Sequence, residues 1–251
     1  MNTLVTSLIN ASRHRLLPYT SFSIGLDVVA GLFDFSVTGV ADISWYFPED
    51  NTTSTLARPA KTLTQEQTVV LSAKWSKTAK LISNNTDSRY VGDLSALSNL
   101  SYQLSLVNCS NITGDLSALS NLSYQLNLGN CPKITGDLSA LSNLSYYLSL
   151  YNCPKITGDL SALSNLSYYL NLGNCSNVTG SLSSSCKATY INLTNIGCSS
   201  AELDTTIANL VTANRLNGTL ILTGLTRTAA SSADVATLES RGWTVTDATI
   251  V

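Results

Sequence analysis

The residues of this sequence best suited to chemistry are cysteines and aspartates that recur at a fixed interval. Four of the six cysteines lie 22 residues apart. A metal site built from cysteines would need CxxC pairs or nearby histidines, and the single histidine, His14, is remote from them in the sequence. We therefore interpret these cysteines as small, weakly polar core residues, with disulfide, metal or redox roles as alternatives. They are Cys109, Cys131, Cys153 and Cys175.

The two remaining cysteines, Cys186 and Cys198, fall outside this interval. The sequence leaves open whether they form a disulfide with each other.

Four aspartates recur with the same spacing and offer two roles. A row of carboxylates could bind a cation such as calcium. An aspartate at a turn more commonly accepts hydrogen bonds from nearby backbone N–H groups. We favour the turn role and keep cation binding as the alternative. The residues are Asp93, Asp115, Asp137 and Asp159.

No pattern in the sequence predicts catalysis. A serine or cysteine nucleophile would need a histidine as its base, and His14 lies in a segment that we expect to be an arm. The chain has no P-loop, GxGxxG, HExxH or GxSxG motif. Carboxylates in line along a turn edge do not offer the acid and base across a cleft that a glycosidase needs. We expect a non-enzymatic protein without a cofactor.

The elements that carry these residues are nearly identical repeats. The segment GDLSALSNLSY occurs four times, starting at residues 92, 114, 136 and 158, and each copy continues as L-x-L-x-N-C-x-x-[IV]-T. Within the first copy, Leu104 and Leu106 flank Ser105, which predicts a short strand with both leucines pointing inward. A single repeat cannot bury this face, so we expect neighbouring repeats to stack as a parallel ladder with a spacing of about 4.8 Å. The core should be filled from the opposite wall by Leu94, Leu97 and Leu100.

This interval and the L-x-L-x-x-[NC]-x-[LI] core resemble the leucine-rich-repeat family. The likeness covers roughly residues 83–200 and implies a parallel solenoid. The sequence departs from the family in having three residues between Leu100 and Leu104 instead of two. The spacing from Cys109 to Ile112 is also one residue longer than in the tightest version. We expect local bulges at these places.

Residues 21–82 follow a different pattern. The segments 33–39, 42–50 and 67–75 alternate apolar and polar residues with a period of two, and Pro, Asp, Asn and Thr separate them. Several short strands with such turns predict a small β-sandwich.

One run within this region suggests a family. The run Ser44-Trp45-Tyr46-Phe47-Pro48-Glu49-Asp50 is followed by a polar turn, by Pro59 and by Val69-Val70-Leu71. This order resembles the immunoglobulin-like PKD family, although that family's glycine–aspartate turn is missing. We assign Trp45 and Phe47 to the core.

Residues 201–251 predict strand–helix units that close the end of the solenoid. Leu203, Ile207 and Leu210 have the spacing of an amphipathic helix. A strand is expected from Gly218, and a second helix capped by Ser231 or Ser232 should end at Gly242. A last strand follows over 243–246. We thus expect a mainly β chain with a parallel leucine-rich-repeat solenoid of 22-residue repeats at 83–200, a β-sandwich at 21–82, an α/β C-terminal cap at 201–251 and an N-terminal arm or attachment segment at 1–20.

The bulk composition limits the partners. Charged residues make up only 12% of the chain and the formal net charge is −2, which leaves no basic patch for nucleic acid or an anionic membrane. No apolar run reaches the length of about 18 residues that a transmembrane helix requires. Residues 1–19 lack a basic start, and Arg13, His14 and Arg15 interrupt their apolar stretch, so we expect no cleaved export signal.

Differences among the four repeats indicate where binding would occur. The GDLSALSNLSY half never changes, whereas outward positions of the strand do. We expect Tyr147, Tyr151 and Tyr169 to form an aromatic cluster on the strand surface, which would suit a sugar or a protein. The alternative is a polar sheet face without a ligand. The candidate binding residues are Gln103, Gln125, Asn127, Tyr147, Ser149, Tyr151, Tyr169 and Asn171.

The C-terminal stretch NGTLILTG…ADVATLESRGWTVT, and the pairing of a PKD-like module with such repeats, are similar to structural proteins of bacteriophages. This resemblance implies a non-enzymatic virion surface protein, such as a fibre, spike or decoration component, that is part of an oligomeric assembly. Its N-terminal region would contact other virion proteins, and its strand face would bind a host glycan or protein. The alternatives are a bacterial cell-surface adhesin and a purely structural assembly protein.

Overall fold

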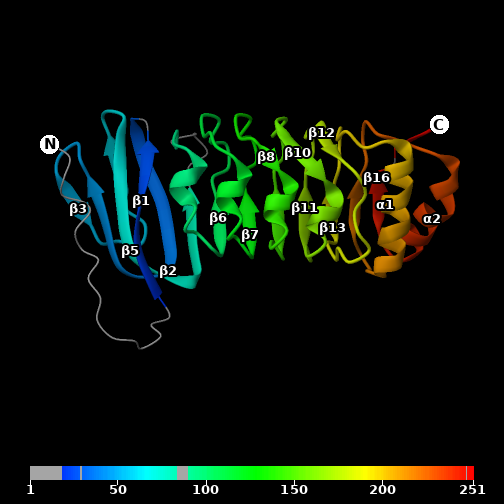
Figure 1. Cartoon of the computed structure of the whole chain (residues 1–251), viewed down its shortest axis with the longest axis horizontal. Helices are drawn as coiled ribbons and strands as arrows, with labels where there is room; N and C mark the ends of the chain where they lie inside the picture. The colour runs from blue at the N-terminus through cyan, green and yellow to red at the C-terminus, as the bar shows by residue number, and fades with distance from the viewer. Residues whose placement is uncertain (1–18, 29, 84–89, 247) are drawn as a thin grey trace.

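The structure is a computed structural model that describes residues 19–28, 30–83, 90–246 and 248–251. It is mainly β, with a long and mostly parallel sheet that is consistent with a solenoid-like fold. Figure 1 shows the elements following one another along the long axis, from the N-terminal strands to helix α2. The arm predicted at 1–20 falls almost wholly outside the described residues.

A ladder of seven short parallel strands runs through most of this length. Each strand pairs with the next strand of the ladder, and Leu104, Leu126 and Leu148 are register partners. These leucines are completely buried, as the alternation with polar residues predicts. The strands are β6 (Gln103–Ser105), β7 (Gln125–Asn127), β9 (Tyr147–Ser149), β11 (Tyr169–Asn171), β13 (Tyr190–Asn192), β14 (Thr219–Ile221) and β16 (Thr244–Thr246).

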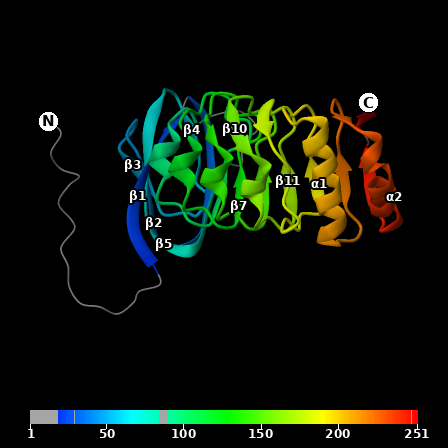
Figure 2. The same ribbon diagram turned by 45° about the vertical axis from the view of Figure 1, so that its right-hand side comes forward.

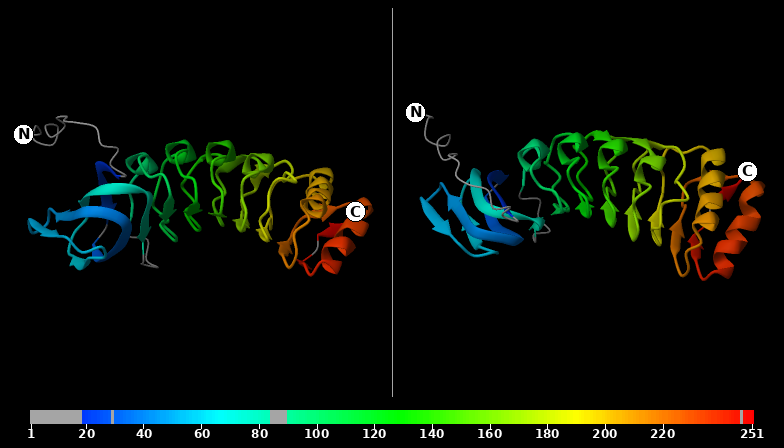
Figure 3. Two further views of the ribbon diagram at one scale, coloured as in Figure 1. Left: turned by 90° about the horizontal axis from the view of Figure 1, so that it is seen from below. Right: turned by 60° about the horizontal axis from the view of Figure 1, so that its bottom comes forward.

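Short 3-10 helices face the ladder across the core. Figures 2 and 3 show the helical turns on one side of the row of repeats and the strands on the other. The row is curved, and the strands lie on its concave side (Figure 3). The helices are η1 (Leu94–Leu97), η2 (Leu116–Leu119), η3 (Leu138–Leu141) and η4 (Leu160–Leu163). Beside them lies a second parallel sheet of β8 (Gly136–Asp137), β10 (Ile156–Asp159) and β12 (Asn177–Thr179).

Each of the four recurring aspartates precedes one of these helices. The Asp93 carboxylate accepts the backbone N–H of Ser95 at 2.9 Å, and the same contact recurs in the three later repeats. It satisfies one of the donors that a helix N-terminus leaves unpaired. The predicted turn role of these residues is confirmed.

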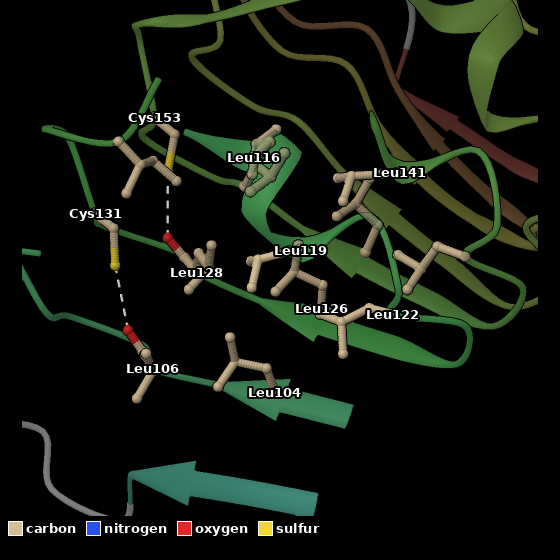
Figure 4. Close-up of a cluster of buried hydrophobic side chains, with 14 of the residues drawn as sticks. Leu104, Leu106, Leu116, Leu119, Leu122, Leu126, Leu128, Cys131, Leu141 and Cys153 are labelled. Carbon is tan, nitrogen blue, oxygen red and sulfur yellow. Dashed lines mark hydrogen bonds between the residues drawn. The ribbon is translucent and has the colours of Figure 1, made fainter. Parts of the chain in front are cut away.

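Leucines and cysteines fill the space between strands and helices (Figure 4). The side chains of Leu94, Leu97 and Leu100 are buried, as predicted. The thiols of Cys131 and Cys153 each lie 3.2 Å from a carbonyl oxygen of the preceding repeat, at Leu106 and Leu128 respectively. The recurring cysteines are therefore core residues that donate to the backbone. All six cysteines are free thiols, so Cys186 and Cys198 form no disulfide.

A ladder of asparagines ends the strands. Asn152 has a φ of 58°, in the left-handed region that asparagine tolerates better than most residues. Its amide donates to Asn130 at 2.7 Å and accepts from Asn174 at 2.6 Å. The chain thus turns out of each strand at a residue that also joins neighbouring repeats. The asparagine ladder consists of Asn108, Asn130, Asn152, Asn174 and Asn195.

The N-terminal strands are longer than predicted. Segments 33–39 and 42–50 were expected to form separate short strands, but β2 spans Gly31–Phe47 without a break. Its register against β5 (Gln67–Ser83) shifts between Thr38 and Val40 and again between Ala41 and Ser44. Positive φ angles at Gly39 and Asp42 mark these two irregularities. The prediction was wrong because a bulge interrupts the alternation without ending a strand.

The same strands join the N-terminal region to the ladder. β5 pairs along one edge with β1 (Tyr19–Val28) and then, in parallel, with β6 of the ladder. β3 (Thr52–Ser54) and β4 (Ala60–Leu63) complete the region by pairing with β2. Trp45 and Phe47 are buried against Phe33, with ring centroids 5.4 and 5.3 Å away. Their predicted core role is confirmed.

The C-terminal region contains α1 (Ser200–Ala213) and α2 (Ser232–Ser240). Ser199 and Glu202 form a capping box at the start of α1. Ser231 occupies the N-cap position of α2, as predicted. Its side chain makes no capping hydrogen bond, because its hydroxyl donates to Asp204 at 2.5 Å instead. A 3-10 turn, η5 (Ala229–Ser231), precedes α2, and two strands that were not predicted, β15 (Thr226–Arg227) and β17 (Thr249–Ile250), pair in parallel. In the part of the chain that the structure describes, no helix is long and apolar enough to cross a membrane.

Candidate binding surface

The outward side chains of the ladder strands form a surface, here called the strand face. The pairing of the strands places these side chains in rows that run across the repeats. None of the outward positions is Asp, Glu, Lys or Arg. They are Gln103, Ser105, Gln125, Asn127, Tyr147, Ser149, Tyr169, Asn171, Tyr190, Asn192, Thr219, Ile221, Thr244 and Thr246.

Three tyrosines of one row stack on one another and form the inner tyrosine stack. The ring centroids of Tyr147 and Tyr169 are 4.3 Å apart, and those of Tyr169 and Tyr190 are 4.4 Å apart. The ring planes differ by only 5° and 4°. The expected proximity of Tyr147 and Tyr169 is confirmed. Tyr190 was not among the predicted residues because its repeat is irregular, although the Tyr-Ile-Asn-Leu sequence at 190–193 matches the strand pattern.

Four further tyrosines form the outer tyrosine stack. Their neighbouring centroids lie 4.5, 4.6 and 4.8 Å apart, and their planes differ by 10° or less. They belong to the invariant half of the repeat, which the sequence assigns to scaffold. Variation between repeats therefore could not reveal them. The residues are Tyr102, Tyr124, Tyr146 and Tyr168.

Stacking changes what these rings can offer to a ligand. A ring inside a stack has both faces against its neighbours, so it presents its edge and hydroxyl group. The expected aromatic cluster is thus two columns of phenol edges rather than one broad platform. Only the terminal rings of a stack can present a face.

Tyr151 belongs to neither stack. Its ring lies over Gly173, where an added Cβ would be 3.0 Å from the Tyr151 ring. At the corresponding position two repeats earlier, a Cβ on Gly129 would meet only ordinary contacts of 3.5 Å or more. The glycine at 173 therefore provides the space in which the Tyr151 ring lies.

Two of the predicted residues offer little surface. Gln103 and Ser149 are only 7% and 5% exposed. Ser149 is a small side chain between Asn127 and Asn171 of the adjoining strands. Gln125, Asn127, Tyr147, Tyr151, Tyr169 and Asn171 keep partial exposure.

The amides of the strand face are held by the backbone. The side-chain oxygens of Asn127, Asn171 and Asn192 accept N–H groups two residues further on, at 3.2, 3.1 and 3.0 Å. These contacts fix the orientation of each amide before any ligand arrives.

The phenols of Tyr147 and Tyr190 stay protonated at neutral pH. Burial, together with the neighbouring phenol of Tyr169, raises the pKa of Tyr147 to about 12. Burial likewise raises the pKa of Tyr190. The hydroxyls can therefore both donate and accept hydrogen bonds.

Comparison of the chain with protein-family models, curated proteins and solved structures gives no match.

Proposed function

We propose that the chain is a leucine-rich-repeat solenoid whose strand face binds a neutral glycan. Support for the repeat assignment comes from the strand partners, which lie 22 residues apart from Gln103 to Tyr169. The buried cysteine at the Asn-or-Cys site of each repeat adds to it. On this proposal the N-terminal strands and the C-terminal strand–helix units close the two ends of the stack.

The single observation that carries the ligand class is the absence of charge from a surface rich in hydroxyls and amides. A charged ligand would lose hydration there without gaining an ion pair. The hydroxyls of a neutral sugar can instead exchange hydrogen bonds with phenols and with amides whose orientation is fixed. Such prearrangement reduces the entropy lost on binding.

For the biological setting, we propose the surface of a bacteriophage particle, with the chain as a non-enzymatic fibre, spike or decoration component. This part rests on the sequence resemblance alone. A bacterial adhesin and a purely structural assembly protein are the alternatives. Mass spectrometry of purified particles tests the setting, and absence of the chain from them would reject it.

Removal of the inner-stack hydroxyls should weaken glycan binding at least about tenfold, because each phenol loses its hydrogen bonds while its ring stays in place. The variant is Tyr147→Phe combined with Tyr169→Phe and Tyr190→Phe. Electrophoresis through gels that contain dextran, hydroxyethylcellulose or galactomannan measures the dissociation constant from the retardation of the protein.

A matched control is Tyr46→Phe, since Tyr46 is an exposed tyrosine of β2 outside the ladder. This variant should be retarded like the wild type. Failure of all three gels to retard the wild-type chain, or stronger retardation by the anionic polysaccharide alginate, would contradict a neutral glycan as the ligand.

A further inference from the structure

The outer tyrosine stack ends at Tyr168. Tyr146 covers one face of this ring at 4.8 Å. Among the described residues no further ring stacks on Tyr168; the tilted ring of Tyr169 has its centroid 6.5 Å away, at an interplanar angle of 39°. Tyr168 is 48% exposed. Thr189 holds the equivalent place in the next strand, where its backbone N–H donates to the Tyr168 carbonyl at 3.0 Å. A threonine is too short to cover a phenol ring.

Tyr190 follows Thr189 and is also hydrogen-bonded to Tyr168 through the backbone. Its backbone N–H also donates to the Tyr168 carbonyl, at 3.1 Å. Its ring stacks on Tyr169 and not on Tyr168, so it stands one strand beyond the end of the outer stack. Tyr168, Thr189 and Tyr190 therefore meet where the outer stack ends, and this place is here called the corner.

We propose that a pyranose ring of the bound glycan stacks on this face of Tyr168, where a fifth tyrosine of the stack would lie. The proposal rests on the glycan-binding function and assigns the position at which the sugar is held. One face of a pyranose ring is lined by C–H groups and suits an aromatic face, whereas its hydroxyls point sideways. On this proposal the hydroxyl groups of Thr189 and Tyr190 exchange hydrogen bonds with them.

This corner differs from the interior of either stack. Inside a stack both ring faces are covered, so no sugar can stack there without separating two tyrosines. Tyr168 is also the most exposed tyrosine of the two stacks, since the other six are half-buried. An aromatic side chain of a partner protein would fill the same space, but it would leave the surrounding hydroxyls without hydrogen bonds.

Thr189→Leu tests the position directly, because a leucine side chain would cover the face of Tyr168. We expect about tenfold weaker binding to whichever of the three neutral polysaccharides retards the wild type most. Tyr168→Phe keeps the ring face and should bind like the wild type. Thr223→Leu, which adds the same bulk at an exposed position after β14, is the control and should also bind like the wild type.

The outcomes separate this proposal from the one on which it rests. Wild-type retardation that Thr189→Leu leaves unchanged would overturn the Tyr168 position alone. An equal loss in Tyr168→Phe would show that the hydroxyl, not the ring face, is used, and would also overturn it. No retardation of the wild type by any of the three polysaccharides would reject glycan binding itself. In that case, chemical shift changes at Tyr168 on adding N-acetyltryptophanamide would assign the corner to an aromatic side chain.

Discussion

Replacement of Asn152 by alanine is expected to lower the free energy of unfolding by about 3 kcal/mol. The asparagine amide donates to Asn130 and accepts from Asn174, and alanine removes both hydrogen bonds. Both partner amides are half-buried, so they lose contacts that water only partly replaces. Alanine must also adopt a φ of 58°. This left-handed conformation is unfavourable for a residue that has a Cβ but no polar side chain to make local hydrogen bonds.

Asn152→Gly separates the two causes. Glycine accepts the left-handed conformation without strain, so this variant should recover about 1 kcal/mol of the loss. Urea unfolding followed by circular dichroism at 218 nm, roughly the minimum for β-structure, measures both variants against the wild type. Equal stability of the wild type and both variants would show that the asparagine ladder does not join the repeats.

The second large effect is expected from alkaline pH. Burial raises the pKa of Cys109 to about 11 and the pKa values of Cys153 and Cys175 to about 12, and it raises the pKa of Cys131 as well. The unfolded chain loses these thiol protons near the ordinary pKa, whereas the folded chain keeps them. Stability is therefore fully present below about pH 8.5 and falls as pH rises toward 12, by about 1 kcal/mol per pH unit for each such thiol.

Cys153→Ser tests this origin of the pH dependence. A serine hydroxyl does not titrate in this range and can still donate to the Leu128 carbonyl. Urea unfolding of the reduced protein at pH 8, 9, 10 and 11 should give a shallower decline for the variant than for the wild type. Identical slopes would mean that the Cys153 thiol is not kept protonated by its burial.

The repetitive core could be predicted from the sequence because the same pattern of apolar and polar residues occurs in each of the four repeats. Leu104, Leu106 and their equivalents alternate with polar residues, and each copy of the repeat supports the same strand. The cysteines followed from the same reasoning, since they lack the partners that metal binding needs. The spacing of these residues is set by their burial, and burial can be predicted from the periodicity of apolar residues in the sequence.

Other features could not be predicted because they depend on contacts between repeats. The Asn108 position looks like an ordinary polar residue until neighbouring amides are placed within hydrogen-bond distance. The outer tyrosine stack has the same origin. All four repeats have a tyrosine at the position of Tyr146. Only the stacked arrangement of the repeats shows that these tyrosines form a continuous column of rings.

The N-terminal and C-terminal regions depart from the predictions for local reasons. Gly39 and Asp42 lie where the two alternating segments 33–39 and 42–50 end and begin, yet in β2 they form bulges within one strand. Ser231 has the residue type of a helix cap, but the Asp204 carboxylate lies close enough to take its hydroxyl. In both cases a tertiary contact decides between two local conformations that the sequence permits.

The most direct test of the proposed function is carbene footprinting of the wild-type chain, with and without the neutral polysaccharide that retards it most. This measurement reports which side of the molecule the ligand covers. We expect lower labelling of Tyr147, Tyr168, Tyr169 and Tyr190, with unchanged labelling of the exposed helix serines Ser95 and Ser117. Protection of those serines, with the four tyrosines labelled as before, would contradict binding at the strand face.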